Sequence, residues 1–266
     1  MKAISRNSGS PATVLLIGGS DSSGGAGIQV DLRMLGAMGV HGVTAITAVT
    51  AQNSRRVISM GVVSARQLTH QLIAAVEDVE IGAVKIGMLG STANIRAVAG
   101  FLRERSLRNI VLDPVLVSTS GSALLPASSL KALREQLIPL ADVLTPNLSE
   151  AAVLLGRRAT GAGAAKALCG LGAKSVLLKG GHGRASEVCD YFAESDDVHT
   201  FRHKRWPFTA RGTGCALASA IAARLARGDS RLAAVTAAEA SLQSAWRNAT
   251  RNGLGARLLL IDVGTN

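Results

Sequence analysis

The sequence predicts an α/β fold with one central, mostly parallel sheet flanked by helices on both faces. Short apolar runs rich in Val, Ile and Leu alternate along the chain with amphipathic stretches, which is the order of strands and helices in such a sheet. The 266 residues are 47% hydrophobic and contain no low-complexity linker or internal repeat. We therefore expect one domain over residues 13–266, preceded by a flexible polar segment over residues 1–12.

Five strands and five helices are expected to alternate along most of the chain. Each expected strand is a short apolar run that ends in glycine or polar residues, and each expected helix is an amphipathic stretch that follows or precedes such a run. The strands are expected at 13–19, 83–89, 109–115, 142–147 and 175–181, and the helices at 28–39, 94–105, 129–137, 148–156 and 161–172.

The remaining third of the chain has a different pattern. Two β-rich runs, at 187–195 and 197–206, predict an antiparallel hairpin. Two Ala-rich helices are then expected at about 213–227 and 231–248.

The formal net charge is +11, from 29 basic and 18 acidic residues. A nucleic-acid-binding protein would use such charge for phosphate contacts. Most of the arginines, however, stand singly on expected helices, and aromatic residues, on which bases would stack, make up only 3% of the chain. A solvated basic surface is the preferred interpretation, and no nucleic-acid partner is expected.

The cysteines are Cys169, Cys189 and Cys215, which are widely spaced and include no CxxC pair. Such a set predicts neither a disulfide framework nor a zinc site, and it suits a reducing compartment. The first residues lack the apolar core of a signal peptide, and no apolar run reaches the roughly 18 residues of a membrane span. A cytoplasmic protein without a membrane partner is expected.

Glycine-rich or polar loops follow the expected parallel strands. In a parallel sheet these loops meet outside the carboxyl ends of the strands, where ligands bind. The loop over residues 18–31, GGSDSSGGAGIQVD, permits close backbone approach to a ligand. It is neither a P-loop nor a GxGxxG dinucleotide motif, and by itself it fits a tight turn equally well. The convergence of several loops therefore carries the prediction of a site.

Two of these loops carry candidate ligands. Asn147 and Glu150 lie three positions apart at an expected helix start, where their oxygens suit Mg²⁺ held largely through water. The same spacing predicts a helix capping box, and the two interpretations are compatible. Lys179 follows an apolar run and precedes two glycines, so its ammonium either reaches a phosphate from the sheet edge or lies along the surface.

Cys215 stands directly after Gly212-Thr213-Gly214, at the start of the expected helix over 213–227. The free N–H groups of a helix start and the helix dipole form an anion site. The same field should lower the pKa of the Cys215 thiol, which could then accept a proton from a substrate hydroxyl. An anion hole beside a base is what phosphoryl transfer to an alcohol needs. The alternative is that Cys215 is only a small apolar residue at a helix start.

The chain contains, in order and over nearly its whole length, the motifs GGSDSSGGAGIQVDL, TAVTAQNS, KIGMLGS, VLDPVLVSTSG, LTPNLSEA, LLKGGH and RGTGCALASA. Together they resemble the hydroxymethylpyrimidine/phosphomethylpyrimidine kinases of thiamine biosynthesis, within the ribokinase superfamily. The resemblance implies a ribokinase-like single domain, Mg²⁺, and transfer of the γ-phosphate of ATP to 4-amino-5-hydroxymethyl-2-methylpyrimidine and then to its monophosphate. A homodimer is also expected. The nearest alternative is a pyridoxal or pyridoxine kinase of the same fold.

The resemblance also implies roles for individual residues. Cys215 would be the base, Gly212 and Gly214 would complete the anion hole, and Lys179 would neutralise phosphate. The substrate would be bound by Gly19, Asp31, Gln52 and Met88, and the metal, largely through water, by Asn147, Glu150 and Asp113. A primary amide at Gln52 can accept a hydrogen bond from the exocyclic amine and donate one to the neighbouring ring nitrogen. The chain departs from the family pattern at Arg211, where many members have His, and we expect Arg211 to direct its charge toward phosphate.

Overall fold

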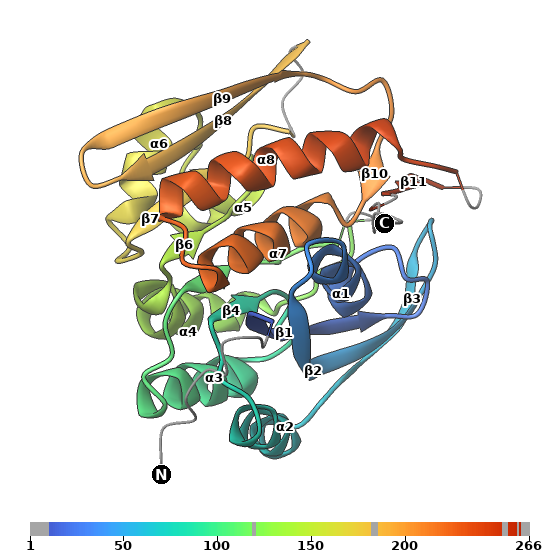
Figure 1. Cartoon of the computed structure of the whole chain (residues 1–266), viewed down its shortest axis with the longest axis vertical. Helices are drawn as coiled ribbons and strands as arrows, with labels where there is room; N and C mark the ends of the chain where they lie inside the picture. The colour runs from blue at the N-terminus through green and yellow to red at the C-terminus, as the bar shows by residue number, and fades with distance from the viewer. Residues whose placement is uncertain (1–10, 119–120, 182–185, 252–254, 260, 262–266) are drawn as a thin grey trace.

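A computed structural model describes residues 11–118, 121–181, 186–251, 255–259 and 261. Residues 1–10 of the expected flexible segment lie outside these ranges. The centre of the structure is a nine-stranded sheet in the order β3-β2-β1-β4-β5-β6-β7-β8-β9 (Figure 1). The strands from β2 through β1 to β7 pair in parallel, whereas β3, β8 and β9 pair antiparallel at the two edges. The predicted mostly parallel sheet is confirmed.

The strands of this sheet are β1 (Thr13–Asp21), β2 (His41–Gln52), β3 (Val57–Val62), β4 (Ala83–Ile86), β5 (Ile110–Leu112), β6 (Val143–Leu144), β7 (Ser175–Leu178), β8 (Glu187–Glu194) and β9 (Asp197–Lys204). A separate two-stranded sheet joins β10 (Ala210–Arg211) and β11 (Arg257–Leu258). The longer helices are α1 (Gly27–Ala37), α2 (Ala65–Glu77), α3 (Thr92–Glu104), α5 (Leu148–Leu155), α6 (Gly161–Cys169), α7 (Thr213–Ala226) and α8 (Arg231–Arg247).

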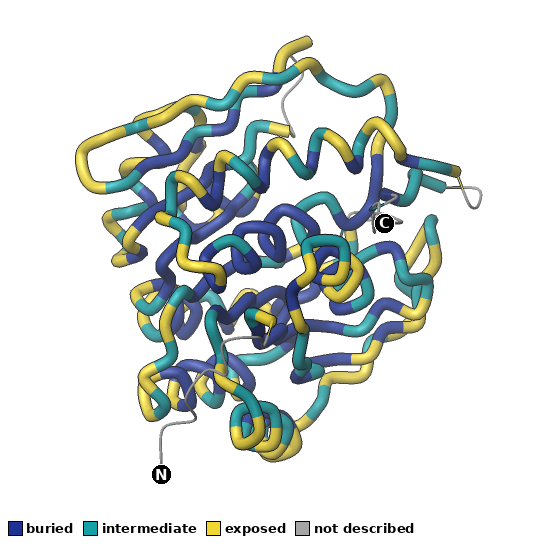
Figure 2. Tube along the Cα trace, in the orientation of Figure 1, coloured by how far each residue is buried: buried dark blue, intermediate teal, exposed yellow. Residues whose placement is uncertain are grey.

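Helices cover both faces of the sheet, as predicted. One layer contains α1, α7 and α8, and the other contains α2, α3, α5 and α6 (Figure 1). In β1 the side chains of Val14 and Leu16 pack toward the first layer, whereas those of Leu15 and Ile17 pack toward the second. Because both faces are covered, the central strands are buried along their length (Figure 2).

The helix expected at 129–137 is present only in an irregular form. A 3₁₀ turn (Ala127–Ser129), an α-helical turn labelled α4 (Leu130–Ala132), a π turn (Leu133–Leu137) and a second 3₁₀ turn (Ile138–Leu140) follow one another. Pro139 has no N–H to donate, and its ring conflicts with the carbonyl four residues earlier. The α-helical ladder therefore cannot run regularly through this segment.

The antiparallel edge formed by β2 and β3, and the helix α2, had no counterpart among the predicted elements. In β2 small residues and threonines interrupt the apolar side chains, so no continuous apolar run marks it. Most of β3 is exposed, which removes the hydrophobic signal on which the prediction of a strand rests. The pairing of β10 with β11 was also missed, since it joins segments far apart in the sequence.

The carboxyl ends of the parallel strands meet at one edge of the sheet. The residues at or just beyond these ends are, in the order of the strands from β2 to β7, Gln52, Asp21, Met88, Asp113, Asn147 and Lys179. Asn147 and Lys179 are bridge partners in neighbouring loops. The predicted convergence of the loops is confirmed, and it places the candidate site. None of the helices in the described ranges combines the length and the apolarity required to cross a bilayer.

Candidate functional site

A cavity of about 690 Å³ opens at the carboxyl edge of the sheet. This volume lies in the range of small-molecule sites. All of the predicted site residues line the cavity, namely Gly19, Asp31, Gln52, Met88, Asp113, Asn147, Glu150, Lys179, Gly212, Gly214 and Cys215. The structure thus brings them together, while the role of each remains a prediction.

The start of α7 forms one wall of the cavity. Gly212 is the N-cap of α7 and has a φ of 75°, a left-handed conformation that favours glycine. A Cβ at Gly214 would lie 3.2 Å from Lys179 Nζ and 3.3 Å from Asp113 Oδ2. Glycine at this position therefore lets a cation approach the free N–H groups of the helix start. This arrangement suits an anionic group such as a phosphate.

The structure corrects the expectation that the helix start lowers the pKa of Cys215. The pKa of the Cys215 thiol is raised to about 11, mainly by burial and also by the carboxylates of Asp31 and Asp113. Lys85 and the backbone N–H of Gly27 act in the opposite direction but do not compensate. Desolvation disfavours the thiolate more than the field of the helix favours it. At this pKa the thiol is protonated at neutral pH.

Lys85 is a buried residue at this site that the sequence analysis missed. Its Nζ lies 2.8 and 2.9 Å from the two carboxylate oxygens of Asp31, and Ser219 Oγ donates to Asp31 Oδ1 at 2.8 Å. Burial alone would lower the pKa of Lys85, but Asp31 raises it above its ordinary value. The only sequence signal for this pair is a lysine inside the apolar run of β4.

This ion pair bears on the role predicted for Asp31. The residue is 0% exposed, and both of its carboxylate oxygens are already hydrogen-bonded. Burial raises the pKa of Asp31, although Lys85 and Ser219 oppose this. Asp31 lies at the floor of the cavity. Because its carboxylate oxygens are already hydrogen-bonded, we infer that it stabilises this floor and does not bind a substrate directly.

Lys179, Asp113 and Glu150 form a second cluster of charges. Lys179 Nζ lies 2.8 Å from Asp113 Oδ1, and Thr145 Oγ1 donates to the same oxygen at 3.1 Å. The pKa of Glu150 is raised to about 7, mainly by burial and also by the charge of Asp113, while Lys179 and backbone hydrogen bonds oppose this shift. A cation between the two carboxylates would relieve their repulsion.

The capping box predicted for α5 is present. Asn147 Oδ1 accepts hydrogen bonds from the N–H groups of Ser149 and Glu150, and Glu150 Oε2 accepts one from the N–H of Asn147. The amide oxygen of Asn147 is therefore used inside the protein. Any contribution of Asn147 to a metal site would be through water.

The half-buried Gln52 and the buried Arg211 are joined in a network of hydrogen bonds. Arg211 Nη2 donates to Gln52 Oε1 at 2.9 Å and lies 3.1 Å from Asp21 Oδ2. Gln52 Nε2 donates to Thr50 Oγ1 at 2.9 Å. The guanidinium of Arg211 thus pairs with side chains of the loops, and the expectation that it is directed at phosphate is not met in this structure. These bonds set the orientation of the Gln52 amide and leave it one N–H and one lone pair.

Two further predicted residues are in contact beside this network. A Cβ at Gly19 would lie 2.9 Å from the sulfur of Met88, so a larger residue here would require Met88 to shift. Met88 is buried with Ala48 and Leu124. Together they give this part of the cavity an apolar wall.

Another part of the cavity wall is aromatic, which the low aromatic content of the sequence did not predict. Trp206, Phe208, Leu242 and Trp246 line it. The ring of Trp206 is parallel to that of Trp246 at 6.3 Å and tilted against that of Phe208 at 5.8 Å. Such a surface suits a flat ring system.

The chain matches the phosphomethylpyrimidine kinase family over residues 21–259. It is 45% identical over 250 residues to a hydroxymethylpyrimidine/phosphomethylpyrimidine kinase of Rhizobium meliloti, which covers 92% of this chain and 94% of that protein. The structure of a phosphomethylpyrimidine kinase from Clostridium difficile aligns with a TM-score of 0.78 and 34% identity over 88% of this chain and 99% of that chain. The structure of an ADP complex of Bacillus subtilis pyridoxal kinase aligns with a TM-score of 0.87 and 32% identity over 95% of this chain and 98% of that chain.

Proposed function

The chain belongs to the phosphomethylpyrimidine kinase family, and on that basis we propose that it transfers the γ-phosphate of ATP to 4-amino-5-hydroxymethyl-2-methylpyrimidine and then to the resulting monophosphate in thiamine biosynthesis. The observation that supports this proposal is the convergence in one cavity of a helix start, a lysine, two carboxylates and a thiol. Phosphoryl transfer depends mainly on positioning and on neutralising charge, which these groups can supply.

In the proposed mechanism the N–H groups at the start of α7 hold the transferred phosphoryl group. Lys179 moves its charge from Asp113 toward the phosphate oxygens, since the free N–H groups and the ammonium lie on the same wall of the cavity. The thiolate form of Cys215 accepts the proton of the substrate hydroxyl. The charge of Lys85 favours that form.

The residues that face this cluster fit Mg²⁺, which the family implies. Asp113 and Glu150 offer buried carboxylate oxygens, and the charge of Asp113 disfavours the ionised form of Glu150. We propose that these two residues hold the ion with its water shell and that Asn147 contributes through water. When bound, Mg²⁺ would neutralise charge on the phosphates of ATP. The aromatic part of the cavity wall would take the adenine ring.

The function is tested by an ADP-release assay that compares the hydroxymethylpyrimidine, its monophosphate and pyridoxal as substrates. We expect turnover of both pyrimidines and a lower kcat/KM for pyridoxal. Turnover of pyridoxal alone would replace this proposal with that of a pyridoxal kinase, which shares the fold. Turnover of the unphosphorylated pyrimidine alone would restrict the activity to the first transfer.

We predict that Gln52→Leu raises the KM for the pyrimidine and leaves the KM for ATP nearly unchanged. The amide of Gln52 is oriented so that one N–H and one lone pair stay available to an aminopyrimidine edge. Loss of that pairing should cost about 1 to 3 kcal/mol, or roughly 5- to 150-fold in KM. Steady-state kinetics with each substrate varied in turn measures the effect. An unchanged pyrimidine KM with a higher ATP KM would assign this loop to the nucleotide.

We predict that Glu150→Gln shifts the Mg²⁺ dependence of the rate to higher concentration. A carboxylate attracts a hydrated divalent ion, whereas an amide does so only weakly. The amide oxygen of Gln can still accept the hydrogen bond from the N–H of Asn147, so the capping box of α5 should survive. A Mg²⁺ titration of kcat is the measurement, with thermal unfolding as the control. An unchanged titration in a less stable variant would leave Glu150 with the capping role alone.

We also propose a homodimer in the cytoplasm. The edge strand β3 exposes Ile58 and Val62, and its neighbour β2 exposes Val49. Apolar side chains on an exposed sheet edge favour association with another chain. Light scattering should give twice the mass of the chain. The three cysteines are unpaired, which suits a reducing compartment.

A further inference from the structure

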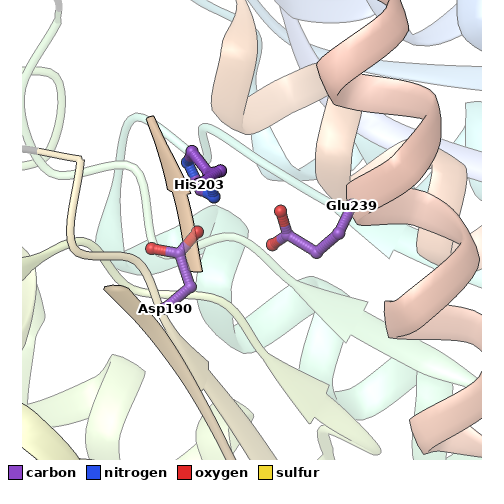
Figure 3. Close-up of side chains that lie close together, drawn as sticks. All are labelled: Asp190, His203 and Glu239. Atoms are coloured by element: carbon purple, nitrogen blue, oxygen red, sulfur yellow. The ribbon is translucent and has the colours of Figure 1, made fainter. Parts of the chain in front are cut away.

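A cluster of ionisable side chains lies outside the set of predicted site residues. Asp190, His203 and Glu239 point toward one another (Figure 3). One nitrogen or oxygen atom from each of the three lies within 4.8 Å of those of the others. None of the three has a role in the mechanism proposed above.

The fold places these residues from three different elements. Val188 of β8 pairs with His203 of β9, and Asp190 is two positions further along β8. Side chains two positions apart point to the same face of a sheet, so Asp190 and His203 share the face that α8 covers. Glu239 enters from α8 (Figure 3). Asp190 and His203 also line the cavity, which gives a ligand a path to the cluster.

Glu239 is the reason to expect a ligand here. Its side chain is only 6% exposed, and neither carboxylate oxygen has a hydrogen-bond partner within the described ranges. Burying a polar group without a partner is costly, and native proteins rarely leave one unsatisfied. Asp190, in contrast, accepts a hydrogen bond from the N–H of Gly180.

The cationic side chains near the cluster make contacts with other groups, so the cluster can accept a metal cation. The charge of Lys179 works to lower the pKa of both Asp190 and Glu239, but its ammonium is paired with Asp113 at 2.8 Å. The charge of Arg205 also works to lower the pKa of Asp190, and its guanidinium donates a hydrogen bond to the carbonyl oxygen of Gly181. Neither cation donates a hydrogen bond to Glu239, whose oxygens are unpartnered.

We propose that Asp190, His203 and Glu239 bind a divalent transition-metal ion of the Zn²⁺ class. Zn²⁺ accepts both imidazole nitrogen and carboxylate oxygen as ligands, and a site with three protein ligands keeps its fourth position for water. Mg²⁺ prefers oxygen ligands and is not expected here, which separates this site from the cluster of Asp113 and Glu150. Small movements of the β8–β9 hairpin toward α8 would bring the donors into coordination distance.

The test is calorimetric titration of the full-length protein, free of nucleotide and Mg²⁺, with Zn²⁺. We expect saturable binding of one ion per chain. Loss of outer-shell partners of a zinc ligand already costs about 10- to 100-fold in affinity, so Glu239→Gln should weaken binding at least as much. If Glu239→Gln does not fold, His203→Gln, which replaces a half-buried histidine of the hairpin, provides a second variant.

Two controls make the result specific. His199→Gln changes an exposed histidine four residues earlier on β9 and should leave the affinity unchanged. Co²⁺ in place of Zn²⁺ should show no thiolate charge-transfer band, which excludes the cysteines as ligands. Absence of saturable Zn²⁺ binding would mean that Glu239 simply holds a proton. Equal Zn²⁺ affinity in all variants, or a thiolate band with Co²⁺, would place the ion at another site. Each of these results overturns the proposal.

Discussion

Cys215→Ala is expected to lower kcat by about 10²- to 10⁴-fold, the usual effect of removing a general base. The N–H groups at the start of α7 do not depend on the side chain, so the KM for ATP should change little. Rapid-quench or steady-state measurement of ADP release gives both constants. Retention of the wild-type kcat would show that the thiol only fills space at the helix start, and the base would then be sought at Asp31 or in water.

The pH dependence of the rate distinguishes a thiolate base from a structural cysteine. Because the pKa of Cys215 is about 11, only a small fraction is ionised at neutral pH. That fraction, and with it kcat, should rise about ten-fold per pH unit between pH 7 and 9 unless bound substrates lower the pKa. Cys215→Ser should remain nearly inactive, since a hydroxyl ionises far less readily than a thiol. A flat wild-type profile with a fully active Cys215→Ser enzyme would contradict the role.

Lys85→Met is expected to lower the free energy of unfolding by about 3 to 5 kcal/mol, because it leaves a buried acid without its partner. Asp31 is 0% exposed and would keep only the hydrogen bond from Ser219. Urea unfolding monitored by circular dichroism measures the change. Lys174→Met is the matched control. Lys174 lies 2.7 Å from Asp142 but is 60% exposed, so solvent screening should hold its effect to about 0 to 1 kcal/mol.

The double variant Lys85→Met/Asp31→Leu separates the charge from the packing at this position. An apolar pair should recover much of the stability lost in Lys85→Met, since no unpaired charge remains. If Lys85→Met were as stable as the wild type, Asp31 would have to be neutral in the native protein. Lys85 would then have no role in holding the floor of the cavity.

Local patterns in the sequence were sufficient to predict the parallel strands β1 and β4 to β7, the β8–β9 hairpin and the position of the cavity, but they did not reveal β2 or β3. Apolar runs such as those of β1, β4 and β7 mark buried strands, because a strand covered on both faces has no polar side. The loops after these strands could be assigned to one edge, since parallel strands all end on the same side. The start of α7 could be read from Gly212 and Gly214, and the capping box of α5 from the spacing of Asn147 and Glu150.

Burial and partners were decided only by the tertiary structure. The helix start at Cys215 predicted a lowered pKa, but the depth of the thiol and the nearby carboxylates of Asp31 and Asp113 raise it, and these residues come from distant segments. Asp31 and Lys85 are 54 positions apart, and neither sequence neighbourhood reveals the other.

The same limit applies to Glu239. On α8 it reads as an ordinary helical glutamate, and only the packing of α8 against β8 and β9 brings it to Asp190 and His203. Electrostatic energies depend on distance and on exclusion of water. The sequence therefore determined most of the strands and helices and which loops meet, whereas three-dimensional packing determined which charges are paired, which are neutral and which lack a partner.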